Sequence, residues 1–109
     1  MLELAGEHHF TLFEYFQTDR CGHKQNWKQA EVIISILGRF LLEIYCSLPE
    51  NMLVLITSDH GNFEDLSTKK HTLNQVPTIL FGKHCTEIAK KINSLVDVTP
   101  AVLAAVDKV

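Results

Sequence analysis

Carboxylate and imidazole side chains follow two apolar stretches of this sequence. Asp59 and His60 come after the run MLVLIT, and Asp19 and His23 come at the end of the aromatic stretch HFTLFEYFQT or shortly after it. His71 lies farther along the polar segment that follows His60. Carboxylate oxygen combined with imidazole nitrogen suits Mn²⁺, Zn²⁺ or iron, whereas Ca²⁺ and Mg²⁺ prefer oxygen ligands alone. We therefore consider these residues as candidate metal ligands.

The number of candidate ligands suggests more than one ion. An open catalytic metal usually takes about three ligands from the protein, and two Asp with three His exceed that. Two ions about 3.5–4 Å apart are a recurring device in phosphoryl transfer and hydrolysis. Simpler interpretations stay open. Asp59 could cap a helix or turn, because Asp-His-Gly-Asn is a sequence typical of turns, and Asp19 could form a surface ion pair with Arg20 or Lys24.

The first half of the chain is predicted to form a strand and a long helix. Residues 9–18 are aromatic and partly alternating, which fits a strand, and the glycine in DRCGH predicts a loop after it. Asn26 and Gln29 have the spacing of a capping box at a helix start, and Pro49 ends that helix. Its polar residues form one narrow stripe, so we expect other elements to cover most of its circumference.

The second half is predicted to contain two strands and two helices. Met52–Thr57 is an unbroken apolar run, which is typical of a strand buried on both faces of a parallel sheet. Val76–Phe81 is predicted to be another strand, Cys85–Ser94 a weak helix and Ala101–Val106 the last helix. This order favours an α/β fold with a partly parallel sheet. Ligands in such folds bind beyond the carboxyl ends of the strands, so we expect the candidate ligands to converge there.

Bulk properties narrow the class of protein. A length of 109 residues suits one small domain, and a net charge of −3 without a Lys/Arg cluster argues against nucleic-acid and membrane partners. No apolar run reaches the roughly 18 residues that span a bilayer, and we expect no signal peptide. Cys21, Cys46 and Cys85 are far apart and odd in number, which predicts a reducing, cytoplasmic location rather than a disulfide scaffold.

Three segments together resemble a known group of enzymes. SDHGN, followed by KKHTLNQVP and an apolar strand, is similar to the C-terminal part of the metalloenzyme domain of the alkaline phosphatase superfamily. The similarity is greatest to cofactor-independent phosphoglycerate mutase and its relatives, including phosphopentomutase. TDRCGHKQN resembles the Asp-x-x-Gly-His segment that precedes a long helix in that family. The resemblance covers residues from about Phe10 to Val106, and it implies a partial alkaline-phosphatase-like α/β/α sandwich with a mostly parallel sheet.

The resemblance also implies roles for the candidate ligands. Asp19, His23 and His71 would bind one divalent ion, and Asp59 and His60 would bind a second, with Mn²⁺ usual in the mutases and Zn²⁺ elsewhere in the superfamily. In that family a phosphoryl group passes to a Ser or Thr nucleophile and then to an acceptor or water. The nucleophile segment has no counterpart here, and Ser58 lacks the GxSxG context of a nucleophilic serine.

We therefore expect the chain to be the metal-binding, C-terminal part of a phosphoryl-transfer or phosphate-ester-hydrolysing enzyme. It would be inactive alone, would need an N-terminal half and a small phosphorylated substrate, and would expose an apolar helix face or sheet edge. The alternatives are a non-catalytic metal-binding remnant and a small structural or interaction α/β domain. Gln75 replaces a family proline without changing a ligand, Glu64 and Asp65 fit a solvated loop, and Thr72 either bonds within the site or stabilises its turn.

Overall fold

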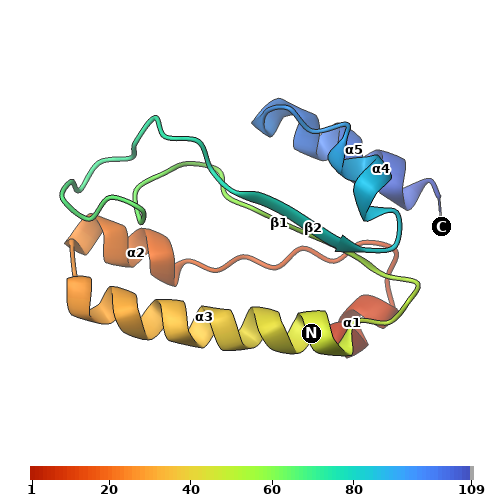
Figure 1. The fold of residues 1–109 in the computed structure, drawn as a ribbon, viewed down its shortest axis with the longest axis horizontal. Coiled ribbons are helices and arrows are strands. Elements are labelled where there is room, and N and C mark those ends of the chain that lie inside the picture. The colour runs from red at the N-terminus through yellow and green to blue at the C-terminus, as the bar shows by residue number, and fades with distance from the viewer. Residues whose placement is uncertain (109) are drawn as a thin grey trace. The chain divides into compact units, whose positions relative to one another are not determined.

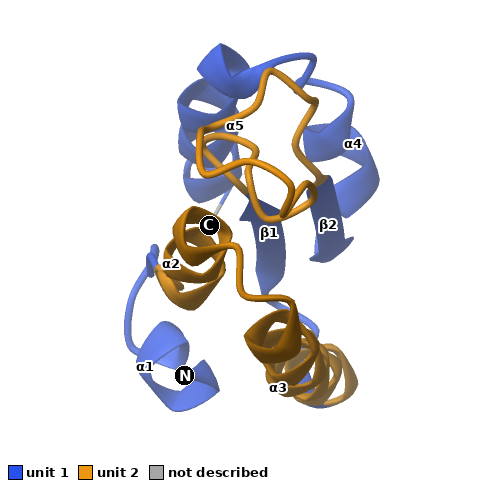
Figure 2. Cartoon of the chain, turned by 90° about the vertical axis from the view of Figure 1, so that its left-hand side faces the viewer, with its two compact units in different colours: residues 1–12, 47–57, 78–109 blue, residues 13–46, 58–77 orange. Residues whose placement is uncertain are grey.

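A computed structural model describes residues 1–108 of the chain. Its elements, in order, are α1 (Leu2–Gly6), α2 (Gln17–Lys24), α3 (Trp27–Ser47), β1 (Leu53–Thr57), β2 (Thr78–Gly82), α4 (Cys85–Ala89), the 3-10 helix η1 (Leu95–Asp97) and α5 (Val98–Val106) (Figure 1). They belong to two compact units, described separately below. Unit 1 comprises residues 1–12, 47–57 and 78 onward, and unit 2 comprises residues 13–46 and 58–77 (Figure 2).

Unit 1 is built around the strand pair β1 and β2. The strands pair in antiparallel register from Leu53 opposite Gly82 to Thr57 opposite Thr78. Helix α4 contacts β2 and also contacts α5. Near the end of α5, the Lys108 ammonium lies 2.8 Å from the carboxylate of Glu87 on α4. The ion pair lowers the pKa of Glu87, mainly through the hydrogen bond from Lys108.

The prediction of a mostly parallel sheet is wrong for these strands. A parallel pair needs a crossover connection, usually a helix, to return the chain to the same end of the sheet. The connection between β1 and β2, residues 58–77, is an irregular loop without a helix. The chain therefore comes back antiparallel, and residues 1–108 show a mixed α/β structure with one two-stranded sheet.

Unit 2 consists of α2, nearly all of α3 and the loop of residues 58–77. The predicted start of α3 is confirmed, because the Gln29 backbone N–H donates to Asn26 Oδ1 at 3.0 Å. Its core is a small apolar cluster with one contribution from α2, two from α3 and one from the loop: Cys21, Ala30, Ile33 and Leu66. Tyr15 and Phe63 pack against this cluster, so the same contacts that hold the two helices together also anchor the loop.

Several predicted boundaries differ from the structure. Residues 9–16 form no strand, since no neighbouring strand pairs with them in the described chain, and α2 begins at Gln17. The strand predicted from Val76 begins only at Thr78, one residue after Pro77, which has no N–H to donate to a ladder. The weak helix predicted over Cys85–Ser94 ends at Ala89, and the last helix starts earlier than expected, at Val98.

Helix α3 buries one side of its surface and exposes apolar residues on the rest. Its buried residues are Ala30, Ile33 and Ile44. Six large apolar side chains of the helix are exposed: Trp27, Val32, Ile34, Ile36, Leu42 and Tyr45. The expectation of cover around most of the helix is therefore wrong for residues 1–108, whereas the expected exposed apolar helix face is present. In the same residues, no helix has the length and apolar character to span a bilayer.

Two neighbouring isoleucines test this packing. Ile33 is 4% exposed and Ile34 is 59% exposed, yet both occupy interior positions of α3. We predict that Ile33→Ala lowers the free energy of unfolding by about 2–4 kcal/mol, because it leaves a cavity in the core. The matched Ile34→Ala should change it by less than about 0.5 kcal/mol. Urea unfolding measures both, and equal losses would contradict the described core.

Candidate metal centre

The side chain of Asp19 lies among three imidazole rings of unit 2. Its Oδ1 atom is 3.3 Å from Nε2 of His23, 3.5 Å from Nε2 of His60 and 3.6 Å from Nε2 of His71. This oxygen is buried and accepts no hydrogen bond from residues 1–108. Buried polar atoms are nearly always paired, so an oxygen surrounded by ring nitrogens and lacking a hydrogen bond is suited to sharing a cation with them.

Helix α2 supplies two of these groups. Asp19 and His23 are four residues apart, a spacing that places both side chains on one face of a helix. The sequence analysis placed them in a loop at the end of a strand because Gly22 suggested a turn. That interpretation is wrong, since Gln17–Lys24 is helical throughout. The i, i+4 spacing of the Asp and His was the signal that could have predicted the helix.

The loop of residues 58–77 supplies the other groups. The rings of His60 and His71 stack with centroids 3.5 Å apart and an interplanar angle of 14°. Nε2 of His71 is also 3.3 Å from Nε2 of His23. Asp59 lies at the edge of the cluster, with Oδ1 3.5 Å from Nε2 of His60 and a side chain that is 87% exposed. All five predicted residues therefore converge, although only Asp59 and His60 directly follow a strand.

Hydrogen bonds outside the cluster orient its rings. Nδ1 of His23 lies 2.7 Å from the carbonyl oxygen of Lys69. A carbonyl oxygen only accepts, so Nδ1 is the donor in this contact, and Nε2 is the ring nitrogen left to bind a metal ion. Ser58 donates its hydroxyl to the carbonyl oxygen of His60 at 2.8 Å, which ties down the turn that carries this histidine.

Three members of the cluster have the geometry of a shared ligand set. Asp19, His23 and His71 each offer one ligand atom, and these atoms lie within 4.8 Å of one another. The group has the chemistry of a divalent transition-metal site, with one carboxylate oxygen and two imidazole nitrogens. It coincides with the set that the resemblance assigns to the first ion. A second ion at Asp59 and His60 stays a prediction.

Asn62 is a supporting residue that the sequence analysis missed. It is 2% exposed, and its Nδ2 donates to the carbonyl oxygen of Thr68 at 2.9 Å. A Cβ placed on Gly22 would overlap Oδ1 of Asn62 and come within 2.7 Å of its Cγ. Glycine is thus required inside α2 because the Asn62 amide packs directly on the helix backbone. This contact brings the loop close to the helix face that carries Asp19.

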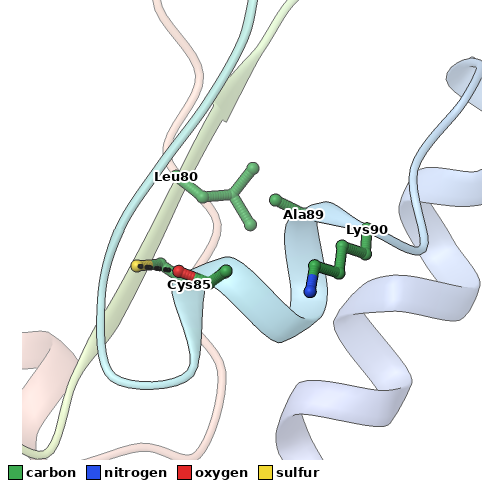
Figure 3. Close-up of a pocket in the computed structure, with 5 residues that line it drawn as sticks. Leu80, Cys85, Ala89 and Lys90 are labelled. Atoms are coloured by element: carbon green, nitrogen blue, oxygen red, sulfur yellow. Dashed lines mark hydrogen bonds between the residues drawn. The ribbon is translucent and has the colours of Figure 1, made fainter.

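Unit 1 has a separate, open depression that contains none of the candidate ligands. It is lined by Leu80 of β2 together with Cys85, Thr86, Ala89 and Lys90 (Figure 3). The Cys85 Sγ and Thr86 Oγ1 atoms are 4.0 Å apart there. A single thiol and a single ammonium do not form a ligand set, and the candidate ligand set found among the described residues lies in unit 2.

Comparison with known protein families agrees with this chemistry. A sequence profile of the Metalloenzyme superfamily matches residues 2–107. The chain belongs to the Metalloenzyme superfamily. Membership implies metal binding, and the Asp19, His23 and His71 group is a possible place for it.

Individual relatives are 2,3-bisphosphoglycerate-independent phosphoglycerate mutases. The enzyme of Clostridium kluyveri is 35% identical over 84% of this chain and 19% of its own length. Those of Ehrlichia canis and Methylobacillus flagellatus are 33% and 30% identical, over 84% and 93% of this chain and 20% and 21% of their own lengths. The chain thus spans about a fifth of the length of the curated relatives it matches, and the resemblance to these mutases is confirmed. No solved structure shows significant similarity.

Two helical glycines test the contact between α2 and Asn62. We predict that Gly22→Ala lowers the free energy of unfolding by about 1–3 kcal/mol, because the new methyl group displaces the Asn62 amide. Gly38→Ala is the matched control, since a Cβ there meets nothing within 4 Å. It should raise the free energy of unfolding by about 0.5–1 kcal/mol through helix propensity alone. Thermal unfolding of both variants measures these changes, and stabilisation by Gly22→Ala would contradict the packing of the Asn62 amide on Gly22.

Proposed function

We propose that this chain is the metal-binding part of an enzyme that transfers phosphoryl groups or hydrolyses phosphate esters, in the manner of the phosphoglycerate mutases. One observation carries the proposal. The buried Asp19 Oδ1 has three imidazole Nε2 atoms within 3.6 Å, which is a donor set for a divalent ion. Family membership and the phosphoglycerate mutase relatives supply the reaction class.

The proposed site holds two divalent ions, Mn²⁺ or Zn²⁺. Asp19, His23 and His71 would hold the first, and Asp59 and His60 would hold the second, for which the exposed Asp59 carboxylate is accessible. Two such ions, when bound, neutralise charge on a phosphoryl group and lower the pKa of a hydroxyl nucleophile. The part of this chain is to place the ligands, and His23 is already oriented for it by the carbonyl of Lys69.

Activity is proposed to require more than these residues. The relatives are about five times longer than the matched region, and α3 exposes six large apolar side chains that another segment could cover. We therefore propose a partial metalloenzyme domain within a larger α/β/α sandwich. An N-terminal half would provide the nucleophile and bind a small phosphorylated substrate. A cytoplasmic location is part of this proposal.

A second candidate is metal binding without catalysis. Two of the three hydroxyl groups that neighbour the ligands in sequence, those of Ser58 and Thr72, donate hydrogen bonds within unit 2. Ser58 donates to the His60 carbonyl, and Thr72 donates to the carboxylate of Glu64. This observation favours a binding role for the chain as it stands. An aryl phosphatase assay on a longer chain that includes the N-terminal half separates the two candidates.

Metal titration tests the proposed site. We predict that the wild-type chain binds two equivalents of Mn²⁺ or Zn²⁺ and that His71→Ala weakens the first ion at least about tenfold, because a direct ligand is lost. Asp19→Asn should do the same, and Asp59→Asn should affect mainly the second ion. His9→Ala is the control, since His9 is exposed and lies outside the cluster. Isothermal titration calorimetry gives the affinities, and equal binding by the wild type and His71→Ala would refute the site.

A further inference from the structure

We propose that Glu64 is a positioning residue that fastens the segment carrying His71 to the turn carrying His60, and so sets the distance between these two ligands. The inference rests on the proposed function, because it takes both histidines as metal ligands. Glu64 itself is not placed in the ligand set. Its part is to fix the backbone on either side of the site.

The carboxylate of Glu64 joins two stretches of the loop. Oε2 accepts a hydrogen bond from the backbone N–H of Asn62 at 2.7 Å. Oε1 accepts one from the hydroxyl of Thr72 and another from Nδ2 of Asn74 at 3.1 Å. Asn62 is two residues after His60, and Thr72 directly follows His71. One side chain thus ties together the backbones that carry both ligands.

Backbone contacts also join the two stretches that Glu64 connects, and we call this place, where Gly61 meets Thr72, the Glu64 junction. The Thr72 N–H donates to the carbonyl oxygen of Gly61 at 2.8 Å, which forms an isolated antiparallel bridge between these residues. A Cβ on Gly61 would overlap the Thr72 hydroxyl and come within 2.6 Å of Glu64 Oε1. The two stretches therefore approach as closely as they do only because position 61 has no side chain. His60 directly precedes Gly61 and His71 directly precedes Thr72, and the two histidine rings stack with centroids 3.5 Å apart.

A carboxylate is the group that this junction requires. All three partners of Glu64 are donors, and a carboxylate accepts through both of its oxygens. The Thr72 hydroxyl bond lowers the pKa of Glu64, against a smaller opposing effect of burial. A glutamine side chain at this position would have nearly the same shape but would turn an amide N–H₂ toward one of the donors. Glu64→Gln therefore opens one half of the junction without removing side-chain volume.

Two pairs of variants test the inference. Glu64→Gln is compared with Asp65→Asn, which removes the same charge one residue along, where the carboxylate accepts hydrogen bonds from the backbone N–H and the hydroxyl of Ser67. Thr72→Val, which loses the hydroxyl, is compared with Thr72→Ser, which keeps it. The measurement is the Zn²⁺ dissociation constant of each folded chain, together with its thermal midpoint and the ¹⁵N spectra of the histidine rings.

The expected result is a separation within each pair. Glu64→Gln and Thr72→Val should raise the Zn²⁺ dissociation constant about tenfold, as loss of outer-shell hydrogen bonds does at metal sites. Asp65→Asn and Thr72→Ser should stay within about threefold of the wild type, since the Asp65 carboxylate accepts from Ser67 and the serine keeps the hydroxyl that donates to Glu64. The His60 and His71 ring signals should move in the first two variants and not in the controls.

Each contrary result has a distinct meaning. If Glu64→Gln lowers only the thermal midpoint and binds Zn²⁺ like Asp65→Asn, Glu64 is merely structural and the inference is wrong. If Glu64→Gln does not fold, the Thr72 pair decides, and equal affinities of Thr72→Val and Thr72→Ser overturn the inference. If the wild type binds no Zn²⁺, the proposed function fails and this inference fails with it.

Discussion

A carboxylate oxygen that is buried without a hydrogen bond is stable only beside groups that can carry or share positive charge. Asp19 Oδ1 is in this position, with three imidazole Nε2 atoms at 3.3–3.6 Å. The histidines come from α2 and from two places in the loop of residues 58–77. The arrangement of unit 2 can be understood as the means of bringing these distant groups to one oxygen.

Three sets of contacts in unit 2, which run from the core toward the site, support that oxygen and its histidines. Cys21, Ala30, Ile33 and Leu66 form the apolar cluster that joins α2, α3 and the loop. Closer in, the Asn62 amide packs on Gly22, so the loop meets the helix next to its ligands. Nearest to the site, Glu64 and Thr72 bond across the two stretches that carry His60 and His71. Next to the ligands the supporting contacts are mainly hydrogen bonds. The positions of the ligand side chains therefore depend more on hydrogen bonding than on apolar packing.

Residue type and spacing predicted the candidate site better than the fold around it. Asp59, His60 and His71 were recognisable because ligand-type side chains in DHGN and KKHT follow a strand and match a family pattern. The N-terminal cap of α3 at Asn26 was also predictable, since capping depends on residues three apart. The α2 helix was missed because Gly22 has a low helix propensity, and only the long-range contact with Asn62 explains its place there.

The parallel sheet and the strand at residues 9–18 were wrong for a related reason. An apolar run specifies burial, whereas strand direction is set by the connection and a strand exists only where a partner pairs with it. The Glu64 junction was equally hidden. Its partners lie in an irregular loop, where hydrogen bonds between residues eight and ten apart have no periodic signature.

The central claim is that Asp19, His23 and His71 share one divalent ion while Asp59 and His60 contact a second. Crystals of the chain grown with Zn²⁺ and measured at the zinc absorption edge test it most directly. The account predicts one anomalous peak about 2.0–2.2 Å from ligand atoms of Asp19, His23 and His71, and another at the same range from Asp59 and His60. Anomalous peaks located only elsewhere in the chain, with the histidine cluster intact and without zinc, would contradict it.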